Sequence, residues 1–438
     1  MIKEVEMMKK FKLLFVLCAM SFLTLASAGI AEAKSYKVTP SKVVKMSKKK
    51  HKKFNNKYTR HYMGLNDYLD KLQKAGGGTL TIKKGTYKIS NSVYVPSNVT
   101  IILEDGVVFQ KLKKTGVKSL KPSGSMWQIC PHNKSRKKNS VKKYNGSKNV
   151  KFIAKGNVVF DMKGVVGIGI IAAHAQNVEI SGITFKGMNG NHYIEVNGTK
   201  NVSIHDCTFT KAKQSTLKKY YNKEAINIDM ADQKTGGLPL AWCKQDKTPC
   251  LDIKIENNVF DGTTRGVGTH KYSQNSKTKA NIYHANVTIN NNTFKNIYDN
   301  GVFILNWKNA VITNNTFTNI GKTSKQSYAS GSHGISGGGI EGITITGNTF
   351  NGIKRNPIYF SIQQNTMGGS SYGPVRVNIT KEQTSAMMNN TFLNCGNDMN
   401  SIFAGYEVLY FRNNGQRDRA NGVGIKMSEK KVYYGIPK

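Results

Sequence analysis

The chain has little cysteine, and this shortage narrows the kind of fold it can adopt. Six cysteines in 438 residues are too few for a scaffold held together by disulfides, and their spacing does not suggest a zinc site. Cys243 and Cys250 share one loop, and they either pair in an oxidising compartment or stay as free thiols. The fold must therefore be stabilised mainly by its own packing.

Acidic residues are also scarce. Asp and Glu number 25 against 65 Lys and Arg, which gives a formal net charge of +40. Such a charge says little about the fold but favours polyanionic partners, which for a secreted chain are acidic glycans, wall polymers or membrane surfaces. The sequence lacks a nucleic-acid recognition motif, so we expect no specific nucleic acid partner.

The apolar run from Leu13 to Leu25 is too short for a comfortable membrane span. It follows a cluster of lysines and precedes two small-x-small sites, Ala26-Ser27-Ala28 and Ala31-Glu32-Ala33. This order is typical of a secretory signal peptide over residues 1–33. We therefore expect a secreted monomer without a transmembrane segment, with association to the cell wall left open.

Residues 34–60 hold ten Lys and one Arg and no acidic residue. Such a run predicts a mobile or loosely attached basic arm, which either adheres to wall polyanions or only aids solubility. Beyond it, residues 64–74 place Leu65, Tyr68, Leu69 and Leu72 at helical spacing. We expect this short amphipathic helix to cap the first coil of the domain that follows, residues 61–438.

That domain is built from a repeat of about nine residues with apolar and polar side chains in alternation, which is the period of a strand. The copies are NVEISGITF (177–185), NVSIHDCTF (201–209), LDIKIENNVF (251–260), NVTINNNTF (286–294), NAVITNNTF (309–317) and GITITGNTF (342–350). The final phenylalanines recur after 24 or 23 residues where no insertion intervenes. We predict stacked coils with an inward phenylalanine column and, two positions earlier, an inward ladder of asparagines that bond to one another.

These repeats, together with Ala75 to Thr79 (AGGGT) and Gly85-Thr86-Tyr87, make the chain similar to the pectin-lyase-like superfamily over roughly residues 60–400. The resemblance implies an all-β fold, a single-stranded right-handed parallel β-helix. It also implies a substrate groove along one sheet. The superfamily includes polysaccharide lyases, polygalacturonase-like hydrolases, epimerases, phage tailspikes and binding proteins, so the fold alone does not settle the function.

Polar side chains gather on one face of the strands that precede the repeats. Strand alternation places Glu195 beside Asn227 in one outward column, and Asn197, Asp229 and His270 in the next. Insertions near residues 210–223 and 231–250 flank this face. We predict a substrate-binding cleft there, with Asn197 and Asn227 on its floor and with Trp242 and Tyr272 stacking on sugar rings.

The chemistry that suits this cluster is β-elimination from a uronic acid. The reaction needs a neutralised sugar carboxylate and a base that removes the adjacent proton. The predicted catalytic residues are Asp229, His270, Lys271 and Arg265, the last three as base or as carboxylate clamp. Glu195 and Asp229 are oxygen ligands suited to Ca²⁺, which is the predicted cofactor.

Three alternatives remain open. A glycoside hydrolase would use Glu195 with Asp229, or Asp229 with Asp232, as its pair of carboxyls. Polygalacturonase-like enzymes usually carry an adjacent Asp-Asp pair, which residues 228–232 (IDMAD) lack, and a full pectate lyase calcium motif is also missing. An epimerase would share the proton abstraction. A non-catalytic carbohydrate-binding adhesin would rely on the basic arm.

Overall fold

A computed structural model describes residues 34–213, 223–322, 331–361, 363 and 372–395, followed by five strands between residues 401 and 434 as backbone only. The predicted signal peptide, residues 1–33, lies outside the described residues. From Ser35 onward the chain forms one unit. Among the described residues, no helix has the length and the apolar composition needed to cross a membrane.

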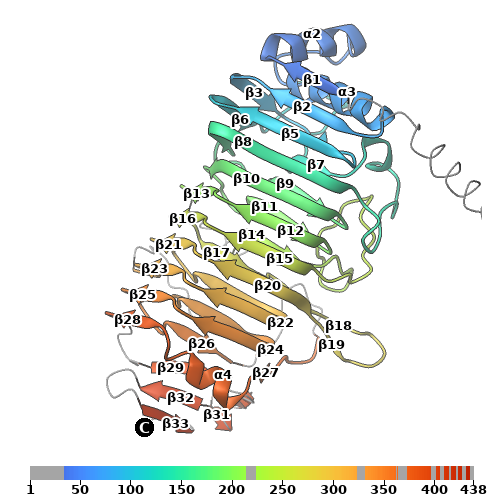
Figure 1. The fold of residues 1–438 in the computed structure, drawn as a ribbon. Helices are drawn as coiled ribbons and strands as arrows, with labels where there is room; N and C mark the ends of the chain where they lie inside the picture. Colours follow the sequence, from blue (N-terminus) through green and yellow to red (C-terminus); the bar gives the residue numbers. More distant parts are fainter. Residues whose placement is uncertain are drawn as a thin grey trace, which may run out of the picture. The chain divides into compact units, whose positions relative to one another are not determined.

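The predicted parallel β-helix is confirmed, because three ladders of parallel strands run along the stack of coils (Figure 1). The first ladder contains the N-V-x-I strands of the repeat. Its members are β1 (Ser35–Val38), β2 (Gly78–Ile82), β5 (Val99–Glu104), β8 (Lys148–Asp161), β10 (Gln176–Lys186), β12 (Lys200–His205), β15 (Leu251–Glu256), β20 (His284–Asn290), β22 (Val302–Thr313), β24 (Ile335–Thr346) and β27 (Val377–Asn378).

The second ladder carries the phenylalanine column. It consists of β3 (Gly85–Ile89), β6 (Val107–Lys111), the second halves of β8 and β10, β13 (Thr208–Thr210), β16 (Val259–Asp261), β21 (Thr293–Lys295), β23 (Thr316–Thr318), β25 (Thr349–Asn351) and β28 (Thr391–Leu393). Rings from Phe209 to Phe350 stack with their centres 4.6 to 4.8 Å apart and their planes nearly parallel. Each coil thus covers the aromatic ring of the next, as the repeat predicts.

The third ladder bears the candidate site. It consists of β4 (Val93–Tyr94), β7 (Ser125–Ile129), β9 (Ile168–Ala173), β11 (Ile194–Asn197), β14 (Glu224–Asp229), β17 (Arg265–Gly268), the first halves of β22 and β24, β26 (Ile358–Phe360) and β29 (Ser401–Ala404). The remaining strands are antiparallel: β18 (Ser273–Gln274) with β19 (Asn281–Ile282), β30 (Leu409–Asn413) with β31 (Gln416–Ala420), and β32 (Val423–Lys426) with β29 and β33 (Lys431–Tyr434). Two short helical segments, η1 (His132–Lys134) and α4 (Lys381–Ala386), lie in the connections.

The inward asparagine ladder is confirmed. Asn258, Asn292 and Asn315 each donate Nδ2 to the Oδ1 of the next asparagine at 2.9 to 3.0 Å, and Asn348 continues the chain to Asn390. The Nδ2 groups also donate to backbone carbonyls of the preceding coil. A buried amide is satisfied here because its neighbour repeats it.

The prediction of a loosely attached arm over residues 34–60 is wrong. β1 pairs with β2 of the first coil, and helix α2 (Pro40–Lys50) packs against α3 (Arg60–Lys74) at that end of the stack (Figure 1). Val43 and Ser47 are the buried residues of α2. Lys48, Lys49 and Lys50 lie in the last turn of α2, where positive charge interacts favourably with the helix dipole. The predicted capping helix is confirmed and begins four residues earlier, at Arg60.

The described cysteines are all unpaired and buried. Cys250 Sγ lies within the coils, in contact with the carbonyl oxygens of Val196 and Asp229. Cys243 packs in a separate small cluster with Trp242 and Cys130. Of the two alternatives for Cys243 and Cys250, the structure has free thiols.

Candidate functional site

The predicted register of the third ladder is confirmed. Glu195 of β11 pairs with Asn227 of β14, which in turn pairs with Gly268 of β17, and Asn197 pairs with Asp229. Parallel pairing puts these outward side chains of β11 and β14 side by side. His270 lies two residues beyond the end of β17, where its backbone N–H donates to Asn227 Oδ1 at 3.2 Å. The strands therefore bring together the polar groups that the sequence placed on one face.

A cavity of about 580 Å³ opens over these strands. Its floor carries Glu195, Asn227 and Asp229, and its walls include His192, Lys223, His270 and Lys271. The insertion over residues 231–250 closes one side through Gly236 to Pro239. Lys271 Nζ donates to Thr235 O, which fixes that wall. Of the other predicted insertion, 214–222 lies outside the described residues.

Two buried carboxyls share the floor of the cavity. Glu195 Oε1 accepts from Asn197 Nδ2 at 2.9 Å, and Glu195 Oε2 accepts from Asn227 Nδ2 at 2.8 Å. Burial outweighs these hydrogen bonds and raises the pKa of Glu195 to about 7. The pKa of Asp229 is also raised, first by burial and then by the nearby Glu195. At neutral pH the pair therefore holds protons that ordinary carboxyls would have lost.

Two basic side chains contact each other at the rim. Lys223 Nζ lies 2.9 Å from His270 Nε2. Burial lowers the pKa of both groups, so His270 is neutral and accepts the hydrogen bond from Lys223. The proton of His270 then resides on Nδ1, which lies 3.7 Å from Glu224 Oε2. This arrangement orients the imidazole and holds the amine of Lys223, whose pKa burial lowers from its ordinary value.

His192 is a second buried imidazole at this site. Burial lowers its pKa to about 3, so it is neutral. Its Nδ1 donates to Glu224 O at 2.8 Å, which leaves the Nε2 lone pair 3.8 Å from Glu195 Oε2. A protonated Glu195 thus faces an acceptor rather than a competing positive charge.

Arg265 does not reach the cavity as a clamp for a sugar carboxylate. Its guanidinium is buried and bonds to Glu224 Oε1 at 3.0 Å and to Asp299 Oδ2 at 2.5 Å. It also packs 3.9 Å from the centre of the Phe303 ring. The hydrogen bond from His270 and then the guanidinium of Arg265 hold the pKa of Glu224 well below its usual range, against the effect of burial. Arg265 therefore positions Glu224.

The two predicted stacking aromatics are not available to sugars. Trp242 is 1% exposed and donates Nε1 to Gln128 Oε1 at 2.7 Å. Tyr272 is 1% exposed and packs with Tyr372, Leu305 and Val375. Both anchor loops to the coils because their large apolar surface is better buried than hydrated. The prediction that they stack on substrate is wrong.

Asp232 also has a structural role. Its Oδ2 accepts from Ser273 Oγ at 2.7 Å and from Tyr372 Oη at 2.6 Å. These bonds tie the 231–250 insertion to two other loops, and Asp232 is 1% exposed. It is therefore absent from the cavity, and a carboxyl pair of Asp229 with Asp232 is excluded.

The side chains around the cavity are a poor set of ligands for the predicted calcium ion. Among the described residues, no group of three or more His, Cys, Asp or Glu side chains is arranged to hold a metal ion. Both oxygens of Glu195 already accept from amides, and Lys223, Lys271 and the imidazoles surround the carboxyls. Ca²⁺ prefers six to eight oxygen ligands. Calcium stays an untested prediction, and no step proposed below depends on it.

Sequence reasoning missed Lys223, His192 and the role of Glu224. Lys223 adjoins an insertion with no recognisable pattern, and His192 lies before β11, outside the alternating columns. The one available signal was the cluster of ionisable residues at the beginnings of neighbouring strands. Whether Asn197, Asn227, Asp229, His270 and Lys271 act on a substrate stays a prediction.

Comparison with known proteins supports the fold. No family model matches the chain. Over 265 residues, 56% of its length, the chain is 24% identical to the plasmin and fibronectin-binding protein A of Streptococcus pneumoniae. The match spans 35% of that relative, so the chain corresponds to about a third of the relative's length.

Two solved structures of PfbA, a surface adhesin of Streptococcus pneumoniae, are also similar. One aligns with a TM-score of 0.55 at 16% identity and covers 86% of this chain and 95% of that one. The other has a TM-score of 0.54 at 18% identity and covers 76% and 85%. At these identities the likeness shows a shared β-helix fold. The assignment to the pectin-lyase-like superfamily in particular stays a prediction.

Proposed function

We propose that this protein is an extracellular, cell-wall-associated β-helix that binds an acidic polysaccharide in the cavity over β11, β14 and β17 and cleaves it by β-elimination. The observation that carries the proposal is the contact of Lys223 Nζ with His270 Nε2 at 2.9 Å. Burial lowers the pKa of both groups, which brings the Lys223 amine closer to the range in which it can act as a general base.

In the proposed elimination, each cavity residue has a separate role. Lys223 takes the proton from the carbon next to the sugar carboxyl, and His270 holds the amine in place. The bond from the neighbouring carbon to the leaving oxygen breaks, and a double bond forms between the two carbons. Protonated Asp229 supplies the proton that the leaving oxygen needs.

The sugar carboxyl must be neutralised for its neighbouring carbon to become acidic. Lys271 supplies a positive charge at the wall, and Glu195, with a pKa of about 7, supplies a hydrogen bond from its protonated form. A neutral carboxyl in a buried site can donate to an oxygen on which negative charge develops. The net charge of +40 favours encounter with a polyanion.

The test is an ultraviolet absorbance assay for unsaturated uronides with polygalacturonate, alginate, hyaluronan and heparin-like glycans, each with calcium and with chelator. We expect Lys223→Met to lower kcat by about 10²- to 10⁴-fold, the usual contribution of a general base. Lys254→Ala, a change at an exposed lysine of β15, is the control and should leave kcat unchanged.

Other outcomes would redirect the assignment. Release of reducing ends without new absorbance would replace elimination by hydrolysis, with Glu195 and Asp229 as the two carboxyls. Formation of neither product from any of the polymers would contradict cleavage altogether.

Surface adhesion is a second proposal, supported by the likeness to the pneumococcal adhesin. It predicts that the chain binds immobilised plasmin, fibronectin or acidic glycan. Binding that persists in Lys223→Met would separate adhesion from cleavage, because this substitution removes the base and leaves the remaining surface intact. An absence of binding to all three would contradict adhesion.

A further inference from the structure

A second cavity, of about 590 Å³, lies between the β18–β19 hairpin and the segment that leads into β27. Its polar lining comes from Gln274, Lys279, Asn281, Tyr283, Arg376 and Asn378. None of the described residues that line it is acidic. The cavity therefore combines amides, an aromatic hydroxyl and positive charge.

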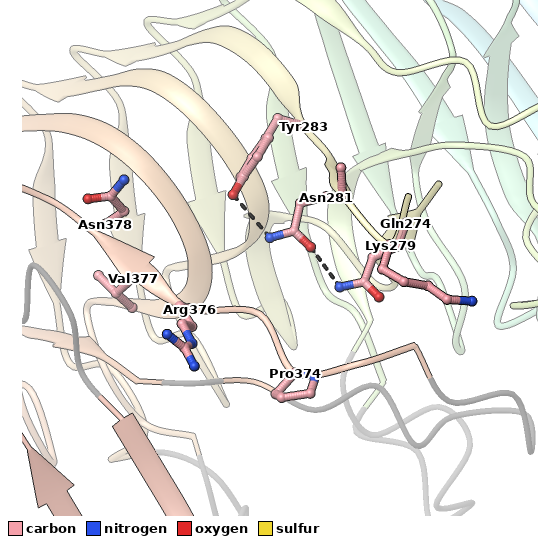
Figure 2. Close-up of a pocket in the computed structure, with 9 residues that line it drawn as sticks. Gln274, Lys279, Asn281, Tyr283, Pro374, Arg376, Val377 and Asn378 are labelled. Carbon is pink, nitrogen blue, oxygen red and sulfur yellow. Dashed lines mark hydrogen bonds between the residues drawn. The ribbon is translucent and has the colours of Figure 1, made fainter. Parts of the chain in front are cut away.

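One wall is held by a chain of hydrogen bonds. Gln274 Nε2 donates to Asn281 Oδ1 at 2.7 Å, and Asn281 Nδ2 donates to Tyr283 Oη at 3.1 Å, as the dashed lines in Figure 2 show. Gln274 is buried, and its Oε1 accepts from Gly373 N at 3.0 Å. Because Tyr283 Oη accepts from Asn281, the tyrosine keeps its own proton for another acceptor.

Two positive side chains lie on either side of Asn281 in Figure 2. Arg376 and Lys279 are both exposed. Lys279 Nζ also donates to Ser276 O at 3.0 Å, which keeps it at the end of the hairpin. The nearby Glu341 forms an ion pair with Lys308, so its charge is offset. An anion between the two cations would meet a surface already positive.

We propose that this second cavity binds an anionic sugar unit, with its carboxylate or sulfate group between Arg376 and Lys279 and its hydroxyls on Asn281, Tyr283 and Asn378. Guanidinium and ammonium donors suit both acidic groups, and amides with a tyrosine suit sugar hydroxyls. The site binds without cleaving and does not require that the first cavity be catalytic.

The hairpin that lines the second cavity contacts the insertion that walls the first. Lys247 Nζ, on the 231–250 insertion, donates to Gln274 O at 3.0 Å and to Ser276 Oγ at 2.8 Å. Gly236 to Pro239 of that insertion line the first cavity. An acidic polymer held at the second cavity is therefore retained beside the insertion that walls the first.

The experiment is calorimetric titration of the whole chain with tetragalacturonate, with a sulfated tetrasaccharide and with neutral cellotetraose at physiological salt. The test variant is Lys279→Ala/Arg376→Ala, and Tyr283→Leu is a second variant that leaves the charge unchanged. The matched control is Lys155→Ala/Lys254→Ala, which removes the same charge from exposed positions on β8 and β15. All are also made in a Lys223→Met/Lys271→Ala background, which disables the first cavity.

We expect the test pair to weaken binding of at least one acidic tetrasaccharide about tenfold or more in both backgrounds, which corresponds to the loss of one charged hydrogen bond. Tyr283→Leu should weaken it less, the control pair should change it by less than about twofold, and cellotetraose should not bind. The acidic probe that binds more tightly identifies the preferred group. Equal losses in test and control pairs, a loss confined to the background with an intact first cavity, or no binding of either acidic probe would overturn the proposal. None of these results depends on product formation, so the proposed cleavage stands or fails separately.

Discussion

Arg265 donates Nη1 to Glu224 Oε1 at 3.0 Å, and the second oxygen of that carboxylate lies 3.7 Å from His270 Nδ1. Glu224 and Arg265 begin the neighbouring strands β14 and β17 of the third ladder, and His270 lies two residues beyond the end of β17. Arg265, which was predicted from the sequence to clamp the substrate carboxylate, therefore lies outside the cavity lining and contacts Glu224 instead. Its charge fixes Glu224, and Glu224 in turn faces the imidazole that holds Lys223.

Arg265→Ala tests this positioning role. Its removal leaves Glu224 and Asp299 buried without a counter-charge, so we expect a loss of about 3 to 5 kcal/mol in the free energy of unfolding. Urea denaturation measures it, with Lys254→Ala as a control that should stay within about 0.5 kcal/mol. If Arg265→Ala were as stable as the control, the ion pairs would not support the site.

The inward asparagine ladder gives a second prediction. Asn315→Ala should destabilise the protein by about 1 to 3 kcal/mol, because Asn292 Nδ2 and Asn315's own backbone partners lose buried hydrogen bonds. Asn314→Gly is the neighbouring control: Asn314 is exposed with a φ of 57°, a conformation that glycine adopts freely. Thermal or urea unfolding should separate the two variants, and equal effects would mean that the ladder is not the source of stability.

Glu195 links stability to pH. Its pKa in the folded protein, about 7, lies above the ordinary value of 4.5, so its ionised form is disfavoured in the folded state. Stability from this group is present below pH 4.5 and is lost as the pH rises toward 7, at about 1.4 kcal/mol for each unit of pKa shift. The pKa of Asp229 is also raised, so this group likewise lowers the stability of the folded protein as the pH rises. Urea denaturation should therefore show that Glu195→Gln gains stability relative to the unmodified protein between pH 5 and pH 8. A constant difference over that range would contradict the raised pKa.

The parts of this molecule that repeat were predictable, and the parts that occur once were not. Phe209, Phe260 and Asn292 recur at fixed positions, so the sequence alone placed them inside the coils. The register of Glu195 against Asn227 followed from the same count. Trp242 sits in a single long insertion whose path depends on tertiary contacts such as that with Gln128. Lys223 adjoins the other insertion, so its place in the site could not be predicted from the repeat either.

The loosely attached arm predicted for residues 34–60 was another error, and the packing of that segment provides the last prediction. A Cβ at Gly64 of α3 would lie 2.1 Å from Val43 O of α2, so any side chain there forces the two helices apart. Gly64→Ala should cost about 1 to 3 kcal/mol, the usual penalty for overpacking, and should expose the 34–60 segment to limited proteolysis. Gly124→Ala is the matched control, because a Cβ there meets nothing within 4 Å and its φ is not positive. If Gly64→Ala resisted proteolysis as well as Gly124→Ala, residues 34–60 would be attached more loosely than their pairing with β2 implies.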